Sequence, residues 1–167
     1  MTLPLEETGA ENGTGNGPLA HWVTEPIRVT YRDTDRMGHV YHANYFVWFE
    51  IGRTELLRAM GSASYRDWEE KEGIFLPVLH CWADFRRAAQ YDELIVVETS
   101  LVELTRASVT FEYVVRPAET GKDGRDETLA TGGTRHAFMD RDGKITRAGD
   151  RLMPEVYRQS MDRKRAR

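Results

Sequence analysis

The chain has 167 residues, of which 40% are hydrophobic and 30% charged, and no apolar run approaches the ~18 residues that a membrane-spanning helix needs. This balance predicts one packed globular domain without a membrane span and excludes a disordered or fibrous chain. The net charge of −4 argues against nucleic acid as the main partner. Because the single cysteine, Cys81, has no partner within the chain, we expect a reducing compartment, the cytoplasm.

Two short terminal segments flank the expected domain, which we place at residues 21–157. Residues 1–20 contain four glycines and few bulky side chains, a composition that predicts a flexible segment. Residues 158–167 carry four arginines and Lys164 against a single acidic residue, Asp162. Such a run is usually a short solvated tail, and an RNA-binding or membrane-surface role is the alternative interpretation.

The first elements along the chain are a strand and a long helix. Ile27, Val29 and Tyr31 alternate with polar residues, which predicts a half-buried first strand. Residues 43–60 predict a helix closed by Gly61, since at 100° per residue the apolar side chains gather on one side. These side chains belong to Tyr45, Trp48, Phe49, Gly52, Leu56, Ala59 and Met60. A second, short helix is expected over residues 64–72.

Consecutive strands make up the rest of the expected domain. The pattern predicts strands over residues 74–86, 93–104, 107–117 and 127–139, with turn dipeptides at Asp123-Gly124 and Asp142-Gly143. One strand, one long helix and then consecutive strands predict an α+β fold in which an antiparallel sheet wraps around one central helix.

The chemically reactive side chains cluster between the first strand and the long helix. Asp33, Asp35, His39 and His42 fall within ten residues. At His42 and Ala43 the helix begins, so unpaired backbone N–H groups and a partial positive charge face whatever docks there. That is an oxyanion site for a carbonyl undergoing acyl transfer. A carboxylate seven residues upstream could activate water or attack the same carbonyl.

A long motif spans this loop and continues into the helix. It reads Tyr31-x-Asp33-Thr34-Asp35-x-x-Gly38-x-Val40-Tyr41-His42-Ala43-Asn44-Tyr45, followed by Glu50 and Arg53-Thr54-Glu55-Leu56-Leu57. The motif resembles the opening of the hotdog-fold acyl-CoA thioesterases of the 4-hydroxybenzoyl-CoA thioesterase type, and most closely their small bacterial branch. The similarity continues through Asp84-Phe85 and Asp92-Glu93 and covers roughly residues 26–140. The resemblance implies the hotdog fold and hydrolysis of an acyl-CoA to a free acid and CoA.

The resemblance also implies roles for individual residues. Asp35 matches the catalytic carboxylate, as general base or as nucleophile, and His42 matches the position whose backbone N–H polarises the thioester carbonyl. Tyr31 and Ala43 fall in the substrate-binding part of the motif. Arg106 resembles a basic position that approaches the CoA phosphates, and a solvated turn arginine is the alternative interpretation. No cofactor or metal is implied.

The resemblance bears on assembly and specificity as well. A curved sheet around one helix leaves edge strands exposed, and family members pair edge to edge, so we expect a homodimer or a dimer of dimers. The sequence departs from the family at His39 and at His80-Cys81-Trp82, so the resemblance does not specify which acyl group the substrate carries.

Other classes of function stay open at this point. A metal-dependent hydrolase could use Asp33, Asp35, His39 and His42, although their spacing is no known zinc signature. A non-catalytic hotdog protein could bind acyl-CoA without turning it over. A serine nucleophile is disfavoured because no Gly-x-Ser-x-Gly elbow occurs. Cys81 follows His80 directly, and neighbours on a strand point to opposite faces, which disfavours a thiol nucleophile.

Overall fold

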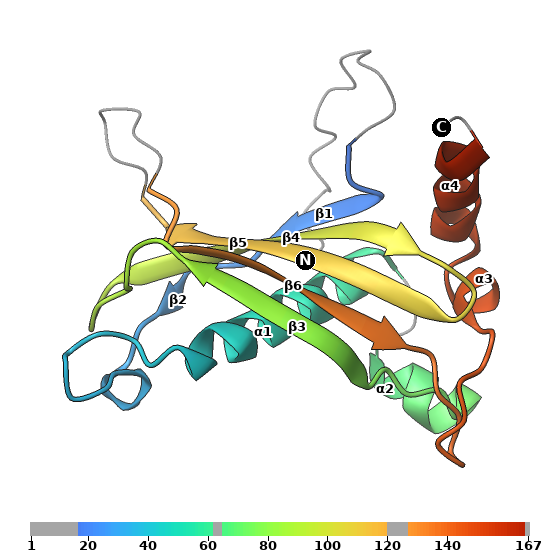
Figure 1. The fold of residues 1–167 in the computed structure, drawn as a ribbon, viewed down its shortest axis with the longest axis horizontal. Helices are drawn as coiled ribbons and strands as arrows, with labels where there is room; N and C mark the ends of the chain where they lie inside the picture. The colour runs from blue at the N-terminus through green and yellow to red at the C-terminus, as the bar shows by residue number, and fades with distance from the viewer. Residues whose placement is uncertain (1–16, 62–64, 120–126, 166–167) are drawn as a thin grey trace.

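The computed structural model describes residues 17–61, 65–119 and 127–165. One antiparallel sheet forms a curved layer, and helix α1 (Ala43–Ala59) lies across one of its faces (Figure 1). The strand order is β1-β4-β5-β6-β3, and the short β2 also pairs with β4. The strands are β1 (Ala20–Val23), β2 (Ile27–Arg28), β3 (Val78–Phe85), β4 (Leu94–Leu104), β5 (Ser108–Pro117) and β6 (Ala130–Ala137). The predicted α+β architecture is therefore confirmed.

Helix α1 packs on the sheet through the apolar face that its periodicity predicts. Its buried residues are Tyr45, Trp48, Phe49, Gly52, Leu56 and Leu57. The ring of Phe49 stacks on that of Tyr113 in β5, with centroids 4.3 Å apart. Gly52 allows the closest approach, because a Cβ there would clash with Thr99 Oγ1 of β4. The helix ends before Gly61, whose φ of +65° is the conformation expected of a closing glycine.

The later elements also follow the predicted order. Helix α2 (Tyr65–Asp67) continues as a π-helical turn, η2 (Trp68–Glu72), which confirms the short helix over the part that the structure describes. Residue 64, where this helix was expected to begin, and the Asp123-Gly124 turn lie outside the described residues. None of the described helices is long and apolar enough to cross a membrane.

The N-terminal part of the prediction needs correction. The first strand is β1, which pairs with β4, and Leu19 N–H donates to the Leu101 carbonyl oxygen at 2.7 Å. The end of the segment predicted to be flexible, residues 1–20, therefore belongs to the sheet, while residues 1–16 lie outside the described residues. The strand predicted around residue 29 is only β2, because the chain turns into the 3-10 helix η1 (Tyr31–Asp33). This turn leaves Tyr31 81% exposed.

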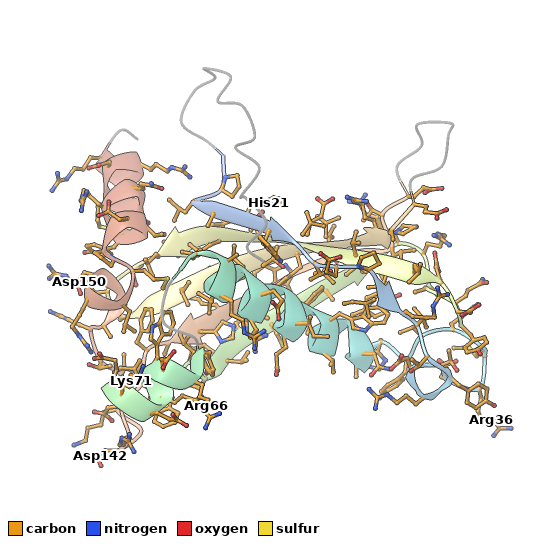
Figure 2. All side chains as sticks on the ribbon, turned by 180° about the vertical axis from the view of Figure 1, so that it is seen from behind. His21, Arg36, Arg66, Lys71, Asp142 and Asp150 are labelled. Carbon is orange, nitrogen blue, oxygen red and sulfur yellow. The ribbon has the colours of Figure 1, made fainter. Side chains whose placement is uncertain are left out.

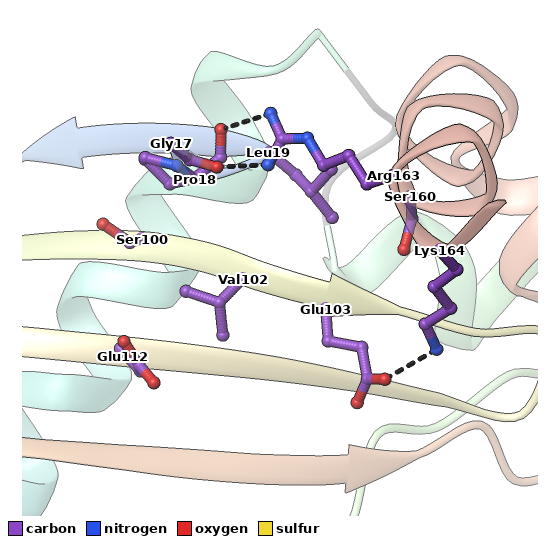
Figure 3. Close-up of a pocket in the computed structure, with 10 residues that line it drawn as sticks. All are labelled: Gly17, Pro18, Leu19, Ser100, Val102, Glu103, Glu112, Ser160, Arg163 and Lys164. Carbon is purple, nitrogen blue, oxygen red and sulfur yellow. Dashed lines mark hydrogen bonds and ion pairs between the residues drawn. The ribbon is translucent and has the colours of Figure 1, made fainter. Parts of the chain in front are cut away.

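The C-terminal segment is a helix rather than a tail. Helix α4 (Pro154–Arg165) follows the short α3 (Gly149–Leu152) and runs without interruption through the expected boundary at residue 157. Ser160 Oγ donates to the Leu104 carbonyl oxygen at 2.8 Å. Figure 3 shows Lys164 paired with Glu103, at 2.7 Å. Sequence periodicity missed α4 because its one buried side chain, Ser160, is polar.

A chain of hydrogen bonds crosses the core beside α1. Nδ1 of the buried His136 lies 3.0 Å from the Leu76 carbonyl oxygen, so Nδ1 carries the proton and Nε2 must accept. Thr134 Oγ1, 2.9 Å from Nε2, is then the donor, and it accepts the hydroxyl proton of Tyr113 at 2.6 Å. Burial lowers the pKa of His136 to about 4 and raises the pKa of Tyr113 to about 12. Both groups are therefore neutral at pH 7.

The buried histidine predicts a loss of stability in acid. The pKa of His136 is about 4 in the folded chain and 6.5 when the ring is exposed. Below pH 6.5 the unfolded state therefore binds a proton at this ring while the folded state stays neutral, which favours unfolding. Between pH 7 and pH 4.5 this removes on the order of 2 to 3 kcal/mol from the free energy of unfolding. Urea unfolding at pH 7 and at pH 4.5 measures this change in the free energy of unfolding. His136→Gln should show a weaker pH dependence than the parent, whereas the exposed His39→Gln should match the parent. Equal pH dependence in all three proteins would contradict the assignment.

Candidate active site

The loop before α1 is held by Asp33. One of its carboxylate oxygens, Oδ2, accepts from the Thr30 N–H at 2.7 Å and from the Thr30 hydroxyl at 2.6 Å, closing a capping box over η1. The backbone carbonyl of Asp33 accepts from Asn44 Nδ2 at 2.8 Å and from the Tyr41 N–H at 2.9 Å. The side chain of Asp33 is thus used to shape the loop, and its carbonyl ties the loop to the first turn of α1.

Asp35 begins a tight turn two residues later. Gly38, at φ +77°, donates its N–H to the Asp35 carbonyl oxygen at 3.0 Å, and the Asp35 N–H donates to the His39 carbonyl oxygen at 2.8 Å. Asp35 Oδ1 accepts from the Met37 N–H at 2.7 Å. Its second carboxylate oxygen has no hydrogen-bond donor among the described residues, so this half-buried carboxylate keeps one oxygen for another partner.

The start of α1 has backbone N–H groups without acceptors among the described residues. The N–H groups of Asn44 and Tyr45 donate to the carbonyl oxygens of Tyr41 and His42, at 2.9 and 3.3 Å. The N–H groups of His42 and Ala43 find no acceptor within the described chain, and no side chain caps the helix. Two unpaired donors therefore stand at the positive end of a 17-residue helix.

An apolar cavity of about 160 Å³ lies beside His42. The ring of Phe85, at the end of β3, is 5.0 Å from that of Tyr45 and 6.4 Å from that of His42. Arg86 and Arg87 also line this cavity, and Arg87 pairs with Glu93 at 3.0 Å. Sequence reasoning did not include these residues in the site. Their one signal was the weak family similarity at Asp84-Phe85.

The structure places Arg106 away from this loop. Strand β4 begins near the Asp35 loop, where His39 forms a β-bridge with Gln90. The other end of β4 leads to Arg106. Eleven residues of strand span roughly 36 Å. Arg106 there pairs with Asp150 at 2.8 Å, and Figure 2 shows Asp150 and Arg36 at opposite ends of the molecule. Within one chain, Arg106 and the Asp35 loop therefore do not meet.

The remaining candidates of the sequence analysis lie near the loop but apart from one another. Tyr31 is on its outer side, with its ring edge-on to Tyr91 at 6.1 Å. His39 is exposed on the Asp35 turn. No group of three or more His, Cys, Asp or Glu side chains among the described residues is arranged to hold a metal ion.

The antiparallel sheet curled around one helix, with a carboxylate turn beside the start of that helix, defines a hotdog-fold protein of the thioesterase class. The profile of the thioesterase-like superfamily matches residues 29–160, and the chain belongs to this superfamily. The resemblance carried by the motif at residues 31–57 is thereby confirmed.

Individual relatives support the same family. A putative acyl-CoA thioesterase of Bacillus subtilis, YneP, is 37% identical over 99 residues, which are 59% of this chain and 70% of the relative. A putative esterase of Aquifex aeolicus is 33% identical over 71% of this chain and 84% of its own length. The structure of a DHNA-CoA thioesterase from Staphylococcus aureus superposes with a TM-score of 0.71 at 28% identity, covering 87% of this chain and 91% of that one.

The bonds of Asp33 predict that its side chain stabilises the fold. Asp33→Ala removes the oxygen that accepts from both donors of Thr30 and should lower the free energy of unfolding by about 1 to 3 kcal/mol. Asp35→Asn keeps an acceptor for the Met37 N–H and should change it by less than about 0.5 kcal/mol. Urea unfolding of the two variants checks this order. A larger loss in Asp35→Asn would show that the two carboxylates have exchanged roles.

Proposed function

We propose that the chain hydrolyses the thioester of an acyl-CoA to a free acid and CoA, with Asp35 as the reacting carboxylate. The observation that carries the proposal is the pair of open N–H groups at His42 and Ala43 beside the Asp35 turn. The antiparallel bridge between Thr34 and Val40 brings that turn back alongside the start of α1. The acyl-CoA thioesterase named among the relatives supports the substrate class.

The geometry supports a simple division of labour. The N–H groups of His42 and Ala43 would bind the thioester carbonyl oxygen and stabilise the negative charge that develops on it, a contribution of roughly 10² to 10³ in rate. Asp35 would take a proton from water as the water oxygen bonds to the carbonyl carbon, or would itself bond to that carbon as a nucleophile. In either case the carbon–sulfur bond breaks and CoA leaves as its thiolate, which then takes up a proton. On the nucleophile route the acyl group is left on Asp35 as an anhydride, and water then hydrolyses this anhydride to the free acid and restores the carboxylate.

The activity is tested by release of free thiol from short, long and aromatic acyl-CoAs. Asp35→Asn should lower kcat at least ~10²-fold with KM little changed. His42→Ala should cost only about 10-fold, because the backbone N–H survives the truncation. Asp33→Asn is the matched control, with all variants checked for folding by circular dichroism.

Each alternative has its own outcome in this test. Near-normal turnover in Asp35→Asn, with turnover abolished in Asp33→Asn, would overturn the assignment of Asp35. Acyl-CoA binding without thiol release would identify a non-catalytic hotdog protein. Activity lost to a strong chelator and restored by a divalent ion would favour a metal-dependent hydrolase.

Strand β3 supports a proposal about assembly. It forms one of the two edges of the sheet, and the side chains of Val78, Leu79 and Phe85 on it are about half exposed. An apolar edge with free N–H and carbonyl groups is a template for another strand. We infer that two copies pair through β3, as a homodimer or within a dimer of dimers. The lone, exposed Cys81 on this strand supports a reducing compartment, the cytoplasm.

Light scattering tests the assembly. The parent chain should be a dimer or tetramer at micromolar concentration. Leu79→Asp places like charges near one another across the paired strands and should shift the chain toward monomer. Ile145→Asp, at an exposed apolar residue away from β3, should leave the mass unchanged. A monomeric parent chain would refute the inference.

A further inference from the structure

Exposed aromatic and basic side chains gather on the outer side of the Asp35 loop. They are Tyr31, Arg32 and Arg36 of the loop itself and Tyr91 of the segment between β3 and β4. Figure 2 shows Arg36 at one end of the molecule. Strand β2 leads into this loop and pairs with β4, which β5 and β6 separate from the β3 edge. The pairing of two copies through β3 therefore uses another part of the sheet.

Two tyrosine rings form the apolar part of this surface. The ring centroids of Tyr31 and Tyr91 are 6.1 Å apart, and the ring planes meet at 81°. In such an edge-to-face pair the rings do not cover each other's faces. Tyr31 is 81% exposed and Tyr91 is 59% exposed. An open tyrosine face is a stacking surface for another aromatic ring, such as a nucleobase.

Hydrogen bonds hold the two rings in place beside each other. Arg28 Nη1 donates to the carbonyl oxygen of Asp92 at 2.7 Å and to its carboxylate at 2.9 Å, which fixes the turn that carries Tyr91. The carbonyl oxygen of Tyr31 accepts from the Thr34 hydroxyl at 2.8 Å. Because the backbone at both tyrosines is already bonded, a ligand that stacks on them pays a small ordering cost.

Two arginines beside the rings lack a strong partner. Arg36 has no hydrogen bond or ion pair within the part of the chain that the structure describes. The Arg32 side chain is 90% exposed and lies 3.9 Å from the Asp33 carboxylate, which closes the capping box. An exposed ion pair at this distance is weak. Both guanidinium groups can therefore bind a phosphate through two parallel N–H donors.

The other carboxylates near this surface are already engaged. Asp92 pairs with Arg28 at 2.9 Å, and Glu93 pairs with Arg87 at 3.0 Å. Asp35 is half-buried and accepts from the backbone of the turn. The charge that the outer side of the loop presents to solvent is therefore mainly positive, and the surface favours an anionic ligand.

The distance to the candidate reaction centre suits the arm of CoA. The Tyr41 N–H donates to the Asp33 carbonyl oxygen at 2.9 Å, so the loop runs beside the segment that leads to His42. Arg36 lies three residues beyond Asp33, at most about 10 Å of chain. About thirteen bonds separate the sulfur of CoA from its diphosphate, or about 16 Å when extended. Arg106 is out of this reach within one chain, since β4 spans roughly 36 Å.

We propose that this surface binds the 3′-phosphoadenosine diphosphate end of CoA. The adenine stacks on the rings of Tyr31 and Tyr91, and the guanidinium groups of Arg32 and Arg36 bind the phosphates. The choice of ligand rests on the proposed thioesterase function, because CoA is the part that its substrates share. These four residues bind the nucleotide and take no part in the chemistry.

Binding is tested by calorimetry on the full chain with adenosine 3′,5′-bisphosphate and with inorganic pyrophosphate. Replacing both arginines, by Arg32→Gln and Arg36→Gln, should lower the affinity for each ligand at least about 10-fold. Tyr31→Ala should lower the affinity for the nucleotide about 10-fold and leave that for pyrophosphate unchanged. Arg58→Gln, at an exposed arginine of α1, is the matched control and should bind both ligands as the parent does. Circular dichroism checks that each variant is folded.

Turnover gives a second measurement. The parent chain should hydrolyse an acyl-CoA with a KM at least about 10-fold below that for the pantetheine thioester of the same acyl group, which lacks the nucleotide. The double arginine variant should raise the KM for the acyl-CoA toward that for the pantetheine thioester. Its kcat/KM for the pantetheine thioester should equal that of the parent, because no phosphate contact is lost there.

The outcomes separate this inference from the proposed function. Thiol release without nucleotide binding, or with binding that neither the arginine variant nor Tyr31→Ala weakens, overturns the inference while the thioesterase function stands. Weaker binding in Arg106→Gln, with none lost in the double arginine variant, also overturns it. If no thiol is released from any acyl-CoA, the proposed function fails. Nucleotide binding that depends on Tyr31 and on the two arginines would then still support this surface as a nucleotide site.

Discussion

The docking of the Asp33 loop onto the first turn of α1 is the contact on which the candidate site depends. The Asp33 carbonyl accepts from the side chain of Asn44 in α1 and from the backbone of Tyr41 just before it, so one atom holds the loop to the helix and to the segment that leads into it. Electrostatic stabilisation of a developing charge requires donors whose direction is set before the reaction begins. This contact holds the start of the helix against the loop, and with it the N–H groups of His42 and Ala43, the donors of the proposed oxyanion site.

The same loop shows how two nearby carboxylates take different parts. One carboxylate oxygen of Asp33 accepts from both donors of Thr30. One oxygen of Asp35 accepts from the Met37 N–H, and the other has no donor among the described residues. The difference lies in the local turns, since the 3-10 helix η1 folds over the first carboxylate and the Gly38 turn leaves the second at its edge. Two residues of the same type, two positions apart, thus acquire a structural and a proposed catalytic role.

The close packing of α1 on the sheet depends on one glycine. The helix lies close to β4, where Gly52 removes the side chain that would keep the two apart. The helix packs mainly against β1, β4 and β5, and it reaches the β3 edge through the rings of Tyr45 and Phe85, 5.0 Å apart. Val78 and Leu79 at the β3 edge remain about half exposed.

The sequence by itself determined α1, the four later strands and the family, because helix and strand periodicity record which face of each element is buried, and the motif at residues 31–45 is contiguous. It could not reveal β1, whose pairing with Leu101 and its neighbours joins segments far apart in the chain, nor α4, whose one fully buried side chain, Ser160, is polar. Only the tertiary structure brought Phe85 to His42, set Arg53 beside His136 and carried Arg106 to the opposite end of β4. The physical reason is that periodicity encodes burial locally, whereas strand register and helix docking decide which buried or reactive groups meet.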